Sequence, residues 1–478
     1  MIKFLHFGVI IIIITIFLGA CSSNNKITEN KTKPKYIFYF IGDGMGMAQA
    51  QIANEYVKNT LNDSLAFMYL PNQGNITTHY NGGLITCSAA SGTALASGEK
   101  TSFNTIGMNT NHTDSLTSLA EAFFQEKMKI GIVASVTIDH ATPAVFYANQ
   151  KKRSQYYRIG KQLSLSGFHY FAGAGYENPN PVSPEDSAAT VGNLYEWDKK
   201  SGYTILRTKT ELESLKDTAL KVHMADSLML KYCIDKPTDA LTLADFVKKG
   251  IEHLDNPHGF FMMVEGSKID HACHEHDAKT AINEVIEFNT AFKVALDFYN
   301  QHPEETLIIV LADHETGGMS LGFDKLGYNT NLSALKHQSI SRELLEEKIN
   351  NWIKNNSSEN SILDSVQYFA GLNSDSTLII DNTDKKRLHE AYIASVAQKK
   401  GNGSTEAVNY GNYEPLSLTA ITILCEKAGI GWTTFHHTGV AVPIRTIGVG
   451  SELVASATDN AEVARKLFTL MGIKNPNR

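Results

Sequence analysis

Four apolar, β-prone runs in this chain each stop where acidic or imidazole side chains follow. The runs cover residues 35–41, 129–135, 260–265 and 306–312, and segments with helical character lie between them. Strands that alternate with helices form a mostly parallel sheet whose two faces are both covered by helices. Open sheets of this kind place their sites beyond the carboxyl ends of the strands. The sequence therefore predicts an α/β fold with its chemistry at one edge of a mostly parallel central sheet.

Composition and charge narrow the class of protein. The 478 residues are 42% hydrophobic and 19% charged, which is ordinary for a globular chain and argues against disorder or a coiled coil. The formal net charge is −7 and no long basic run is present. Because binding to a nucleic acid requires a Lys/Arg surface that neutralises phosphates, nucleic acid is not expected as a specific partner.

Residues 1–20 have the pattern of an export signal. Lys3 is followed by an apolar run at 9–17, and Leu-Gly-Ala then precedes Cys21. This tetrad resembles a bacterial lipobox, in which the cysteine is lipidated and becomes the new N-terminus. The alternative is a transmembrane anchor, but the run is shorter than the roughly 20 residues of a span. We expect an exported protein that is anchored to the membrane through lipid on Cys21, in the periplasm or at the outer membrane of a Gram-negative bacterium.

The mature chain then divides into a short tether and one long domain. Residues 21–34 are polar and predict a flexible tether, and residues 35–478 predict the domain itself. Within the domain, residues 325–425 are rich in Asn, Ser and Lys, with helical stretches at 341–354 and 385–398. We interpret this segment as an insertion at the rim of the site.

Carboxylate and imidazole side chains gather just beyond the strands. The candidate metal ligands are Asp43, Glu265, Asp270, His274, Asp313, His314 and, later in the chain, His437. Asp270 and His274 are four residues apart, so on a helix they face the same way. Taken singly, such an aspartate is usually a helix cap and such a histidine is usually structural. The joint pattern indicates metal, because mixed carboxylate and imidazole sets suit zinc and all-oxygen sets suit magnesium.

The candidate nucleophile, Ser88, lies in a run of small residues at 86–98. Small side chains allow a helix start to pack closely beneath a substrate, and the free N–H groups there favour phosphate. A serine hydroxyl needs a base or a metal to become nucleophilic, and no G-x-S-x-G or Ser-His-Asp setting is evident. The alternative is a tightly packed helix without chemistry.

Six ordered motifs resemble those of alkaline phosphatases. They are Asp-Gly-Met-Gly at 43–46, Ser-Ala-Ala-Ser-Gly-Thr-Ala at 88–94, His-Ala-Thr-Pro at 140–143, Val-Glu-Gly-Ser-Lys-Ile-Asp-His at 264–271, Ala-Asp-His-Glu-Thr-Gly-Gly at 312–318 and His-Thr-Gly at 437–439. They follow the order of the family and span nearly the whole mature chain.

The resemblance implies a role for each matching residue. It implies that Ser88 attacks phosphorus, coordinates zinc and becomes a phosphoserine. Asp270, His274 and His437 would hold one zinc ion, and Asp43, Asp313 and His314 a second. Asp43, Thr142 and Glu265 would hold a third ion, usually magnesium. Arg153 matches the arginine that grips phosphate, with Arg158 as a rival.

Three positions depart from the best-known bacterial members. His140 and His271 resemble the animal branch, and the resemblance implies that both contribute to substrate binding. An imidazole at His140 puts magnesium at the third site in doubt, because imidazole suits zinc better. Cys87 stands where those members have aspartate, and we interpret it as a buried spacer, with a redox-sensitive thiol as the alternative.

The predicted function is metal-dependent hydrolysis of small phosphate monoesters through a phosphoserine. A phosphodiesterase or sulfatase of the same superfamily is an alternative, but those usually lack the set formed by Thr142 and Glu265. A silent metal- or phosphate-binding lipoprotein is a second alternative, although every mapped position holds a competent residue. By resemblance alone, a homodimer is expected.

Overall fold

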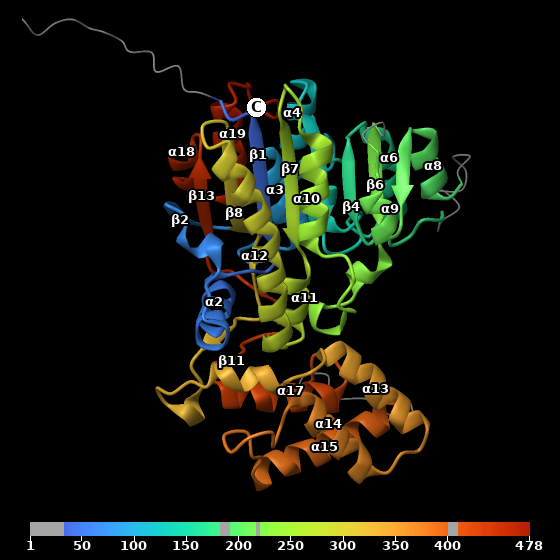
Figure 1. Cartoon of the computed structure of the whole chain (residues 1–478), viewed down its shortest axis with the longest axis vertical. Helices are drawn as coiled ribbons and strands as arrows, with labels where there is room; N and C mark the ends of the chain where they lie inside the picture. The colour runs from blue at the N-terminus through green and yellow to red at the C-terminus, as the bar shows by residue number, and fades with distance from the viewer. Residues whose placement is uncertain (1–32, 182–191, 217–219, 400–409) are drawn as a thin grey trace, which may run out of the picture. The chain divides into compact units, whose positions relative to one another are not determined.

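A nine-stranded sheet forms the centre of the molecule in this computed structural model, which describes residues 33–181, 192–216, 220–399 and 410–478. Its strand order is β2-β13-β8-β1-β7-β3-β4-β6-β5 (Figure 1). The strands are β1 (Tyr36–Gly42), β2 (Asn72–Ile76), β3 (Lys129–Ala134), β4 (Tyr170–Gly173), β5 (Tyr203–Leu206), β6 (Lys221–Ala225), β7 (Phe260–Gly266), β8 (Thr306–Ala312) and β13 (Val442–Gly448). Among these strands, β13 pairs antiparallel with β2 and β8 and every other pair is parallel, so the predicted mostly parallel sheet is confirmed.

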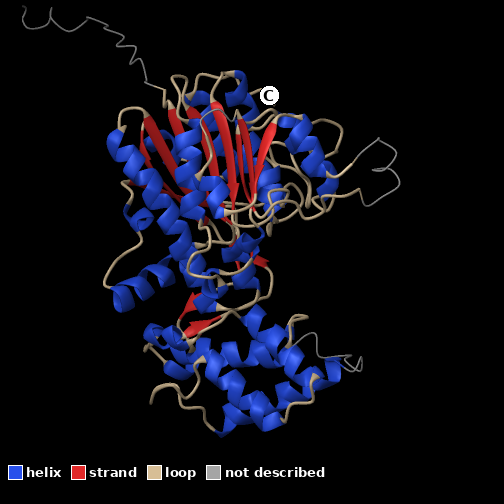
Figure 2. Cartoon of the chain, turned by 45° about the vertical axis from the view of Figure 1, so that its right-hand side comes forward, coloured by secondary structure: helices blue, strands red, loops and turns tan. Residues whose placement is uncertain are grey.

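Helices cover both faces of this sheet (Figure 2). On the sheet domain they are α2 (Met47–Leu61), α3 (Ser88–Ser97), α4 (Leu119–Gln125), α5 (Ala141–Ala144), α6 (Tyr156–Ser166), α8 (Leu194–Lys200), α9 (Lys209–Glu213), α10 (Leu243–Leu254), α11 (Lys268–His274), α12 (Ala278–Gln301), α18 (Ser451–Ala455) and α19 (Asn460–Leu470). Short 3-10 turns η1 (Ala66–Tyr69), η2 (Ser227–Leu230) and η3 (Cys233–Asp235) join some of them.

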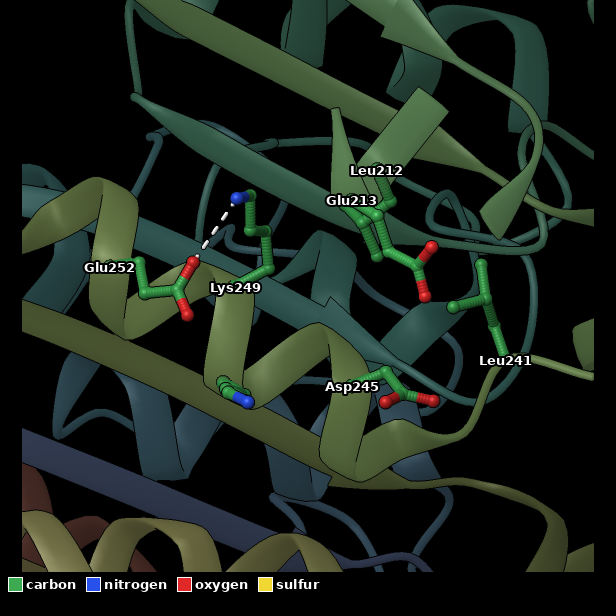
Figure 3. A pocket seen from close by; sticks show the side chains of 7 residues that line it. Leu212, Glu213, Leu241, Asp245, Lys249 and Glu252 are labelled. Atoms are coloured by element: carbon green, nitrogen blue, oxygen red, sulfur yellow. Dashed lines mark hydrogen bonds and ion pairs between the residues drawn. The ribbon is translucent and has the colours of Figure 1, made fainter. Parts of the chain in front are cut away.

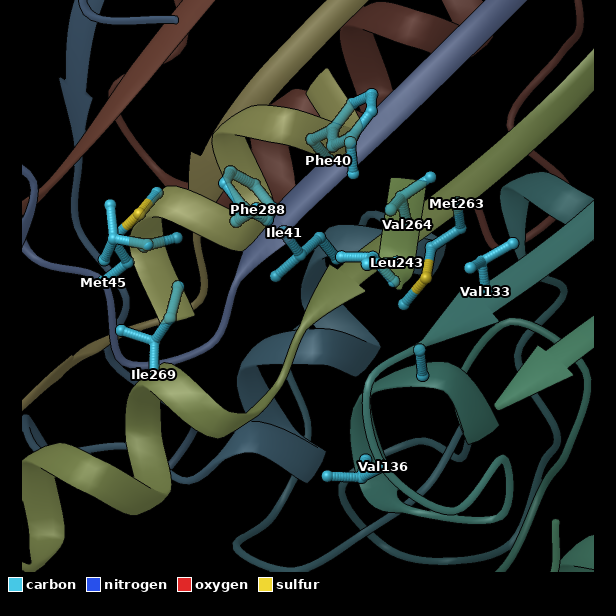
Figure 4. Packing of buried hydrophobic residues seen from close by; sticks show 14 of the residues in the cluster. Phe40, Ile41, Met45, Val133, Val136, Leu243, Met263, Val264, Ile269 and Phe288 are labelled. Carbon is cyan, nitrogen blue, oxygen red and sulfur yellow. The ribbon is translucent and has the colours of Figure 1, made fainter. Parts of the chain in front are cut away.

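The central strand β1 is apolar along its whole length because helices cover both of its faces. Successive side chains of a strand point to opposite faces. The Phe40 ring packs on Phe288 of α12 at 5.6 Å between ring centroids, whereas the Tyr39 hydroxyl donates to the Leu95 carbonyl of α3. Figure 4 shows Phe40, Ile41 and Phe288 within this packing. Because β1 is buried on both sides, every one of its residues is buried.

The register of the three central strands sets the position of the polar residues that follow them. Gly42 at the end of β1 lies beside Gly266 of β7 and beside Ala312 of β8. The strands therefore end at the same level, and the segments that begin at Asp43 and Asp313 emerge side by side.

The helical stretch that follows β7 is divided into two helices. α11 ends at His274, α12 begins at Ala278, and His276 between them has a φ of 55°. This left-handed backbone ends a helix. Sequence periodicity did not reveal the break, because a histidine rarely adopts this conformation.

The segment after β8 is mostly helical. It contains η4 (Asp324–Leu326), η5 (Leu332–His337), α13 (Arg342–Lys354), α14 (Glu359–Ala370), α15 (Asn382–Lys399) and α17 (Pro415–Ala428). The chain leaves and returns through a small antiparallel pair, β10 (Ser320–Leu321) with β11 (Ile430–Gly431). Asp277 connects it to the sheet domain, because its carboxylate accepts from the Gln338 amide at 3.0 Å and the Arg342 N–H at 2.8 Å.

None of the helices in the described ranges combines the length and the apolar character that a membrane-spanning helix requires. The predicted signal, the lipidation residue Cys21 and the tether up to residue 32 lie outside the described residues.

Candidate active site

Every predicted site residue comes to one region. The residues lie at strand ends, on the helices α3, α5 and α11, on one short strand and, for Arg153, on a turn. Asp43 and Asp313 follow β1 and β8, Glu265 ends β7, and α11 carries three more of the residues. His437 arrives on β12 (His437–Thr438), which pairs antiparallel with β9 (Glu315–Thr316) directly after His314. This pairing explains how a residue more than 100 positions away joins the strand-end cluster.

Asp270, His274 and His437 form the first group of potential metal ligands. The His274 and His437 Nε2 atoms are 3.1 Å apart, and they lie 3.3 Å and 3.6 Å from oxygens of Asp270. Each Nδ1 faces a backbone carbonyl, that of Phe435 for His274 and that of Thr86 for His437. A carbonyl only accepts, so Nδ1 of each ring carries a proton, and the Nε2 lone pair is available to a cation when the ring is neutral. Two facing lone pairs and a carboxylate fit a shared cation.

Asp43, Asp313 and His314 form the second group, next to Ser88. The His314 Nε2 atom lies 3.3 Å from Asp43, 3.2 Å from Asp313 and 3.3 Å from the Ser88 hydroxyl oxygen. The two carboxylates and the imidazole are fully buried. Asp313 Oδ1 accepts N–H bonds from Gly44 at 3.1 Å and from His314 at 2.9 Å, whereas its Oδ2 has no hydrogen-bond partner in the described part of the chain.

Thr316 sets the orientation of two ligands at once. Its hydroxyl donates to Asp270, which can only accept when ionised, and lies 3.2 Å from His314 Nδ1. The hydroxyl proton is thus committed, so His314 Nδ1 donates and its Nε2 lone pair faces the second group. Three imidazoles therefore present Nε2, the arrangement that a metal-binding histidine needs.

A third group surrounds Asp43 on its other side. Ligand atoms of Asp43, Glu265 and His140 lie within 4.8 Å of one another, and the Thr142 hydroxyl is 3.5 Å from Asp43. Both Glu265 carboxylate oxygens are buried without a hydrogen-bond partner among the described residues. Buried polar atoms are normally satisfied, so the unpartnered oxygens fit a bound cation.

The shifted pKa values of these groups also indicate that the groups bind cations. Burial, followed by the neighbouring Asp313 charge, holds the pKa of Asp43 well above its usual range. Burial raises the pKa of Asp313 to about 8 and that of Glu265 to about 7. Although burial lowers the pKa of His274, the adjacent Asp270 carboxylate raises it to about 9. Carboxylates packed this closely need protons or metal ions to offset their repulsion.

Ser88 is the first residue of α3, as the sequence predicts. Its helix begins after Cys87, which provides no side-chain cap to the first turn. Ser91, one turn later, donates to the Asp313 carbonyl at 2.6 Å and fixes the helix against the end of β8. The amides of the first turn and the helix dipole are thus available to an anion beside Ser88.

Arg153 reaches the same region through His140. The guanidinium nitrogen is 3.0 Å from His140 Nε2, and the His140 ring lies 5.7 Å from that of His271. The Cys87 sulfur accepts the Asn104 N–H, and the Asn104 carbonyl accepts the Arg153 N–H. Cys87 is buried, and Asn104 connects it to the Arg153 backbone.

Sequence reasoning missed two residues that hold ligands in place, Thr316 and Glu315. Thr316 and Glu315 lie within the motif at 312–318, but only the fold shows that Thr316 contacts both Asp270 and His314. Glu315 is buried and binds Gln49 and Thr438, which fastens β12 and therefore His437. His276 is stacked between Trp432 and Phe435, at 5.0 Å and 4.1 Å between ring centroids.

A cavity of about 400 Å³ adjoins the site, and His271 and His274 form part of its wall. A smaller cavity of about 220 Å³ lies between α9 and α10, lined by residues such as Leu212, Asp245 and Lys249 (Figure 3). None of the predicted site residues lines the smaller cavity.

A parallel sheet whose strand ends converge on a buried serine, three imidazoles and several carboxylates defines a metal-dependent hydrolase of the phosphoryl-transfer class. Comparison with known proteins gives the family. The sequence model described as Alkaline phosphatase matches residues 34–169 and 173–473. The chain belongs to the alkaline phosphatase family and is a phosphatase that hydrolyses phosphate monoesters.

Individual relatives agree with this assignment. Alkaline phosphatase 3 of Bacillus subtilis is 30% identical over 460 residues, covering 94% of this chain and 91% of the relative. A cold-active alkaline phosphatase from a psychrophilic Shewanella species is 27% identical with a TM-score of 0.76, covering 91% of this chain and 99% of that one. The Thermus thermophilus alkaline phosphatase shares the fold at 22% identity, with a TM-score of 0.77, covering 92% of each chain.

Proposed function

We propose that this phosphatase acts through Ser88 as its nucleophile, with Arg153 holding the phosphate. One observation carries the proposal: Ser88 Oγ lies 3.3 Å from the Nε2 atom of His314, which belongs to the buried carboxylate group of Asp43 and Asp313. The His314 Nε2 lone pair near this serine also faces the Asp43 and Asp313 carboxylates, and this donor set suits a metal ligand better than a general base. Activation therefore falls to a cation held by that group.

The donor sets fit two zinc ions and a third divalent ion. Asp270, His274 and His437 would hold one zinc. Asp43, Asp313, His314 and the Ser88 oxygen would hold the second. Asp43, Thr142 and Glu265 would hold the third, which we propose to be magnesium. When bound, such ions stabilise anionic oxygens and lower the pKa of a hydroxyl or a water molecule.

The identity of the third ion depends on His140. This imidazole lies within the group of Asp43 and Glu265, and imidazole favours zinc over magnesium. An alkaline phosphatase of the Antarctic bacterium TAB5 holds magnesium at its M3 site in variants where one histidine is replaced by aspartate or glutamate. By analogy, we expect His140→Asp to increase magnesium relative to zinc in the purified protein, and unchanged metal content would contradict this.

The residues of the chain carry the reaction as follows. The Ser88 hydroxyl releases its proton to solvent and its oxygen attacks phosphorus. An O–P bond forms as the bond to the alcohol oxygen breaks, and the alcohol leaves with a proton taken from solvent. The guanidinium of Arg153 and the amides of the first turn of α3 bind the phosphoryl oxygens. Water then attacks the phosphoserine, which releases inorganic phosphate and restores the hydroxyl. His140 and His271, beside Arg153, complete the wall around the phosphate.

The test replaces the nucleophile while keeping its helix. Ser88→Ala should lower kcat for an aryl phosphate monoester by at least about a thousandfold, because no other side chain can form the covalent intermediate. Ser97→Ala is the matched control, since Ser97 lies buried at the far end of α3, where its hydroxyl donates to the Thr93 carbonyl and accepts from the Glu99 N–H. Full activity in Ser88→Ala would reject the serine mechanism. Rates for a matched diester and a sulfate would test the monoester preference.

We further propose that the protein is exported and anchored through lipid on Cys21, at the periplasmic face of a Gram-negative envelope, and that it forms a homodimer. The lipobox-like tetrad at 18–21 supports the anchor. Cys21→Ala should move the protein from the membrane fraction to the soluble fraction, and an unchanged distribution would contradict the anchor. Sedimentation of the protein lacking residues 1–21 would test the dimer.

A further inference from the structure

We propose that Asn460, the first residue of the C-terminal helix α19, is a positioning residue for two of the metal ligands. It is the middle of a hydrogen-bonded relay that starts at Lys100 and passes through Ser91. The relay ends at the peptide group that joins Asp313 to His314. Its role rests on the ligand roles proposed above for these last two residues, and it adds a reason why they keep their geometry.

Three hydrogen bonds make up the relay. The Lys100 ammonium donates to the side-chain oxygen of Asn460 at 2.5 Å, and the side-chain nitrogen of Asn460 donates to the Ser91 hydroxyl at 2.8 Å. The Ser91 hydroxyl donates to the Asp313 carbonyl at 2.6 Å. Both Asn460 and Ser91 are buried, and a hydrogen bond is electrostatically stronger in the low dielectric of the interior than in water.

The two ends of the relay set the direction of every bond in it. An ammonium only donates, so the Asn460 oxygen faces Lys100 and its NH2 group faces Ser91. A backbone carbonyl only accepts, so the Ser91 proton points to Asp313. Hydrogen bonds that run in one direction polarise one another. The relay therefore acts as a unit, and reversal at any member changes the bond to Asp313.

The relay ends on the peptide group between two ligands of the same ion. The carbonyl of this group belongs to Asp313 and its N–H belongs to His314. That N–H donates to one oxygen of the Asp313 carboxylate at 2.9 Å, and the other oxygen lies 3.2 Å from His314 Nε2. Because a peptide group is planar, a bond that fixes its carbonyl also fixes its N–H. Loss of the Ser91 bond would let this plane rotate and would displace both ligands.

The start of the relay is itself held in place. The Lys100 ammonium pairs with Asp459 at 2.8 Å, and Asp459 is the residue before Asn460. The Asn460 backbone N–H donates to the Thr77 carbonyl at 3.0 Å. An asparagine that is fixed at its backbone and at its side-chain oxygen presents its NH2 group to Ser91 with little freedom. Helix α19 also packs against α3, which carries Ser88 and Ser91.

The test reverses the middle of the relay without changing its size. Asn460→Asp keeps the acceptor for Lys100 but places a second acceptor where the NH2 group stood. The Ser91 proton then turns to this oxygen and leaves the Asp313 carbonyl. In equilibrium with a chelator and without substrate, one of the two zinc ions of the full-length protein should dissociate at about tenfold higher free zinc than in the wild type. At limiting zinc, monoester hydrolysis should fall in parallel.

Two further variants separate positioning from general damage to α3. Asn477→Ala is the matched control, because the Asn477 side chain donates to the Ser97 carbonyl at the other end of α3. This control should lower Tm but leave zinc affinity unchanged. Ser91→Ala removes the last donor of the relay and should weaken zinc as much as Asn460→Asp does. The double variant should lose no more than either single variant, since the bonds of one relay are lost together.

Zinc affinity that is unchanged in either Asn460→Asp or Ser91→Ala would overturn the relay, as would losses that add up in the double variant. His314→Ala separates that result from a failure of the proposed ligands. If His314→Ala binds zinc as tightly as the wild type, the proposed ligand set is wrong and the relay has no role. If His314→Ala loses zinc while the relay variants keep it, only the relay is wrong.

Discussion

Three imidazoles in this site have their tautomers fixed by oxygens of the chain. His274 and His437 donate to the Phe435 and Thr86 carbonyls, and His314 donates to the Thr316 hydroxyl. The identities of the histidines followed from the sequence, because they stand beside strand ends and in recognisable motifs. The hydrogen-bond partners of these histidines could not be predicted from the sequence. Two of the partners are backbone carbonyls, which every residue has, and nothing in the sequence distinguishes Thr316 from other threonines.

Thr316→Val tests this orientation at the scale of one hydroxyl. Valine keeps the shape but removes the donor to Asp270 and the acceptor for His314. We expect zinc affinity to fall by about 10- to 100-fold, the usual effect of removing a group that orients a metal ligand. Competition with a chelator measures the affinity. Thr290→Val, on the exposed face of α12, is the control, and equal affinities of the two variants would contradict the assignment.

At the scale of elements, the strands were predicted best. The run at 306–312 is β8 residue for residue. The runs at 129–135 and 260–265 differ from β3 and β7 by one residue at one end, and the run at 35–41 differs from β1 by one residue at each end. A strand buried on both faces leaves a continuous apolar run, which is a strong signal. The break between α11 and α12 depends instead on His276, whose conformation is stabilised by contacts with Trp432 and Phe435 that lie far away in the sequence.

His276→Ala tests the connection between these elements. The ring joins the α11–α12 junction to the segment that carries His437, and its Nε2 atom lies 2.8 Å from the Thr434 carbonyl. Loss of two aromatic contacts and one hydrogen bond should lower the free energy of unfolding by about 2–4 kcal/mol. Denaturant unfolding measures this. His276→Phe, which keeps the stacking, should lose less than half as much, and an equal loss would show that stacking is not the cause.

At the scale of the whole molecule, the sequence predicted the layers but not every connection. The antiparallel strand β13 lies between β8 and β2, and no local pattern distinguishes it from a parallel strand. The most buried helix of the insertion, α17, lies at the end of a segment whose composition is polar, and its apolar residues surround the helix instead of repeating on one face. Such a helix gives no amphipathic signal.

The buried carboxylates predict how metal removal affects the stability of the fold across pH. The raised pKa values of Asp43 and Asp313 mean that their protonated forms are favoured in the folded, metal-free protein. Their contribution to stability is complete below the unfolded pKa of 3.8 and is lost as pH rises through about 8 for Asp313. Bound cations offset this loss. The difference in Tm between the metal-loaded and metal-free protein should therefore grow by about 2–5 °C from pH 6 to pH 9.

Thermal unfolding with and without chelator at the two pH values measures this difference. Metal-free Asp313→Asn provides the comparison, because it lacks the titrating group and its Tm should depend less on pH than that of the metal-free wild type. The Tm difference between metal-loaded and metal-free protein could instead stay constant from pH 6 to pH 9. That result would show that repulsion between the buried Asp43 and Asp313 carboxylates does not limit the stability of the metal-free protein.

Zinc content and monoester hydrolysis, followed in one sample through chelation and restoration of zinc and magnesium, test the account most directly. We predict that hydrolysis falls by at least about a thousandfold as zinc is removed and returns as about two zinc ions per chain are restored, because the clusters around His314 and His437 activate Ser88 and its ester. Chelation also yields protein that holds less than about a tenth of a zinc ion per chain. If the hydrolysis by this protein is undiminished, the result contradicts activation of Ser88 by bound zinc.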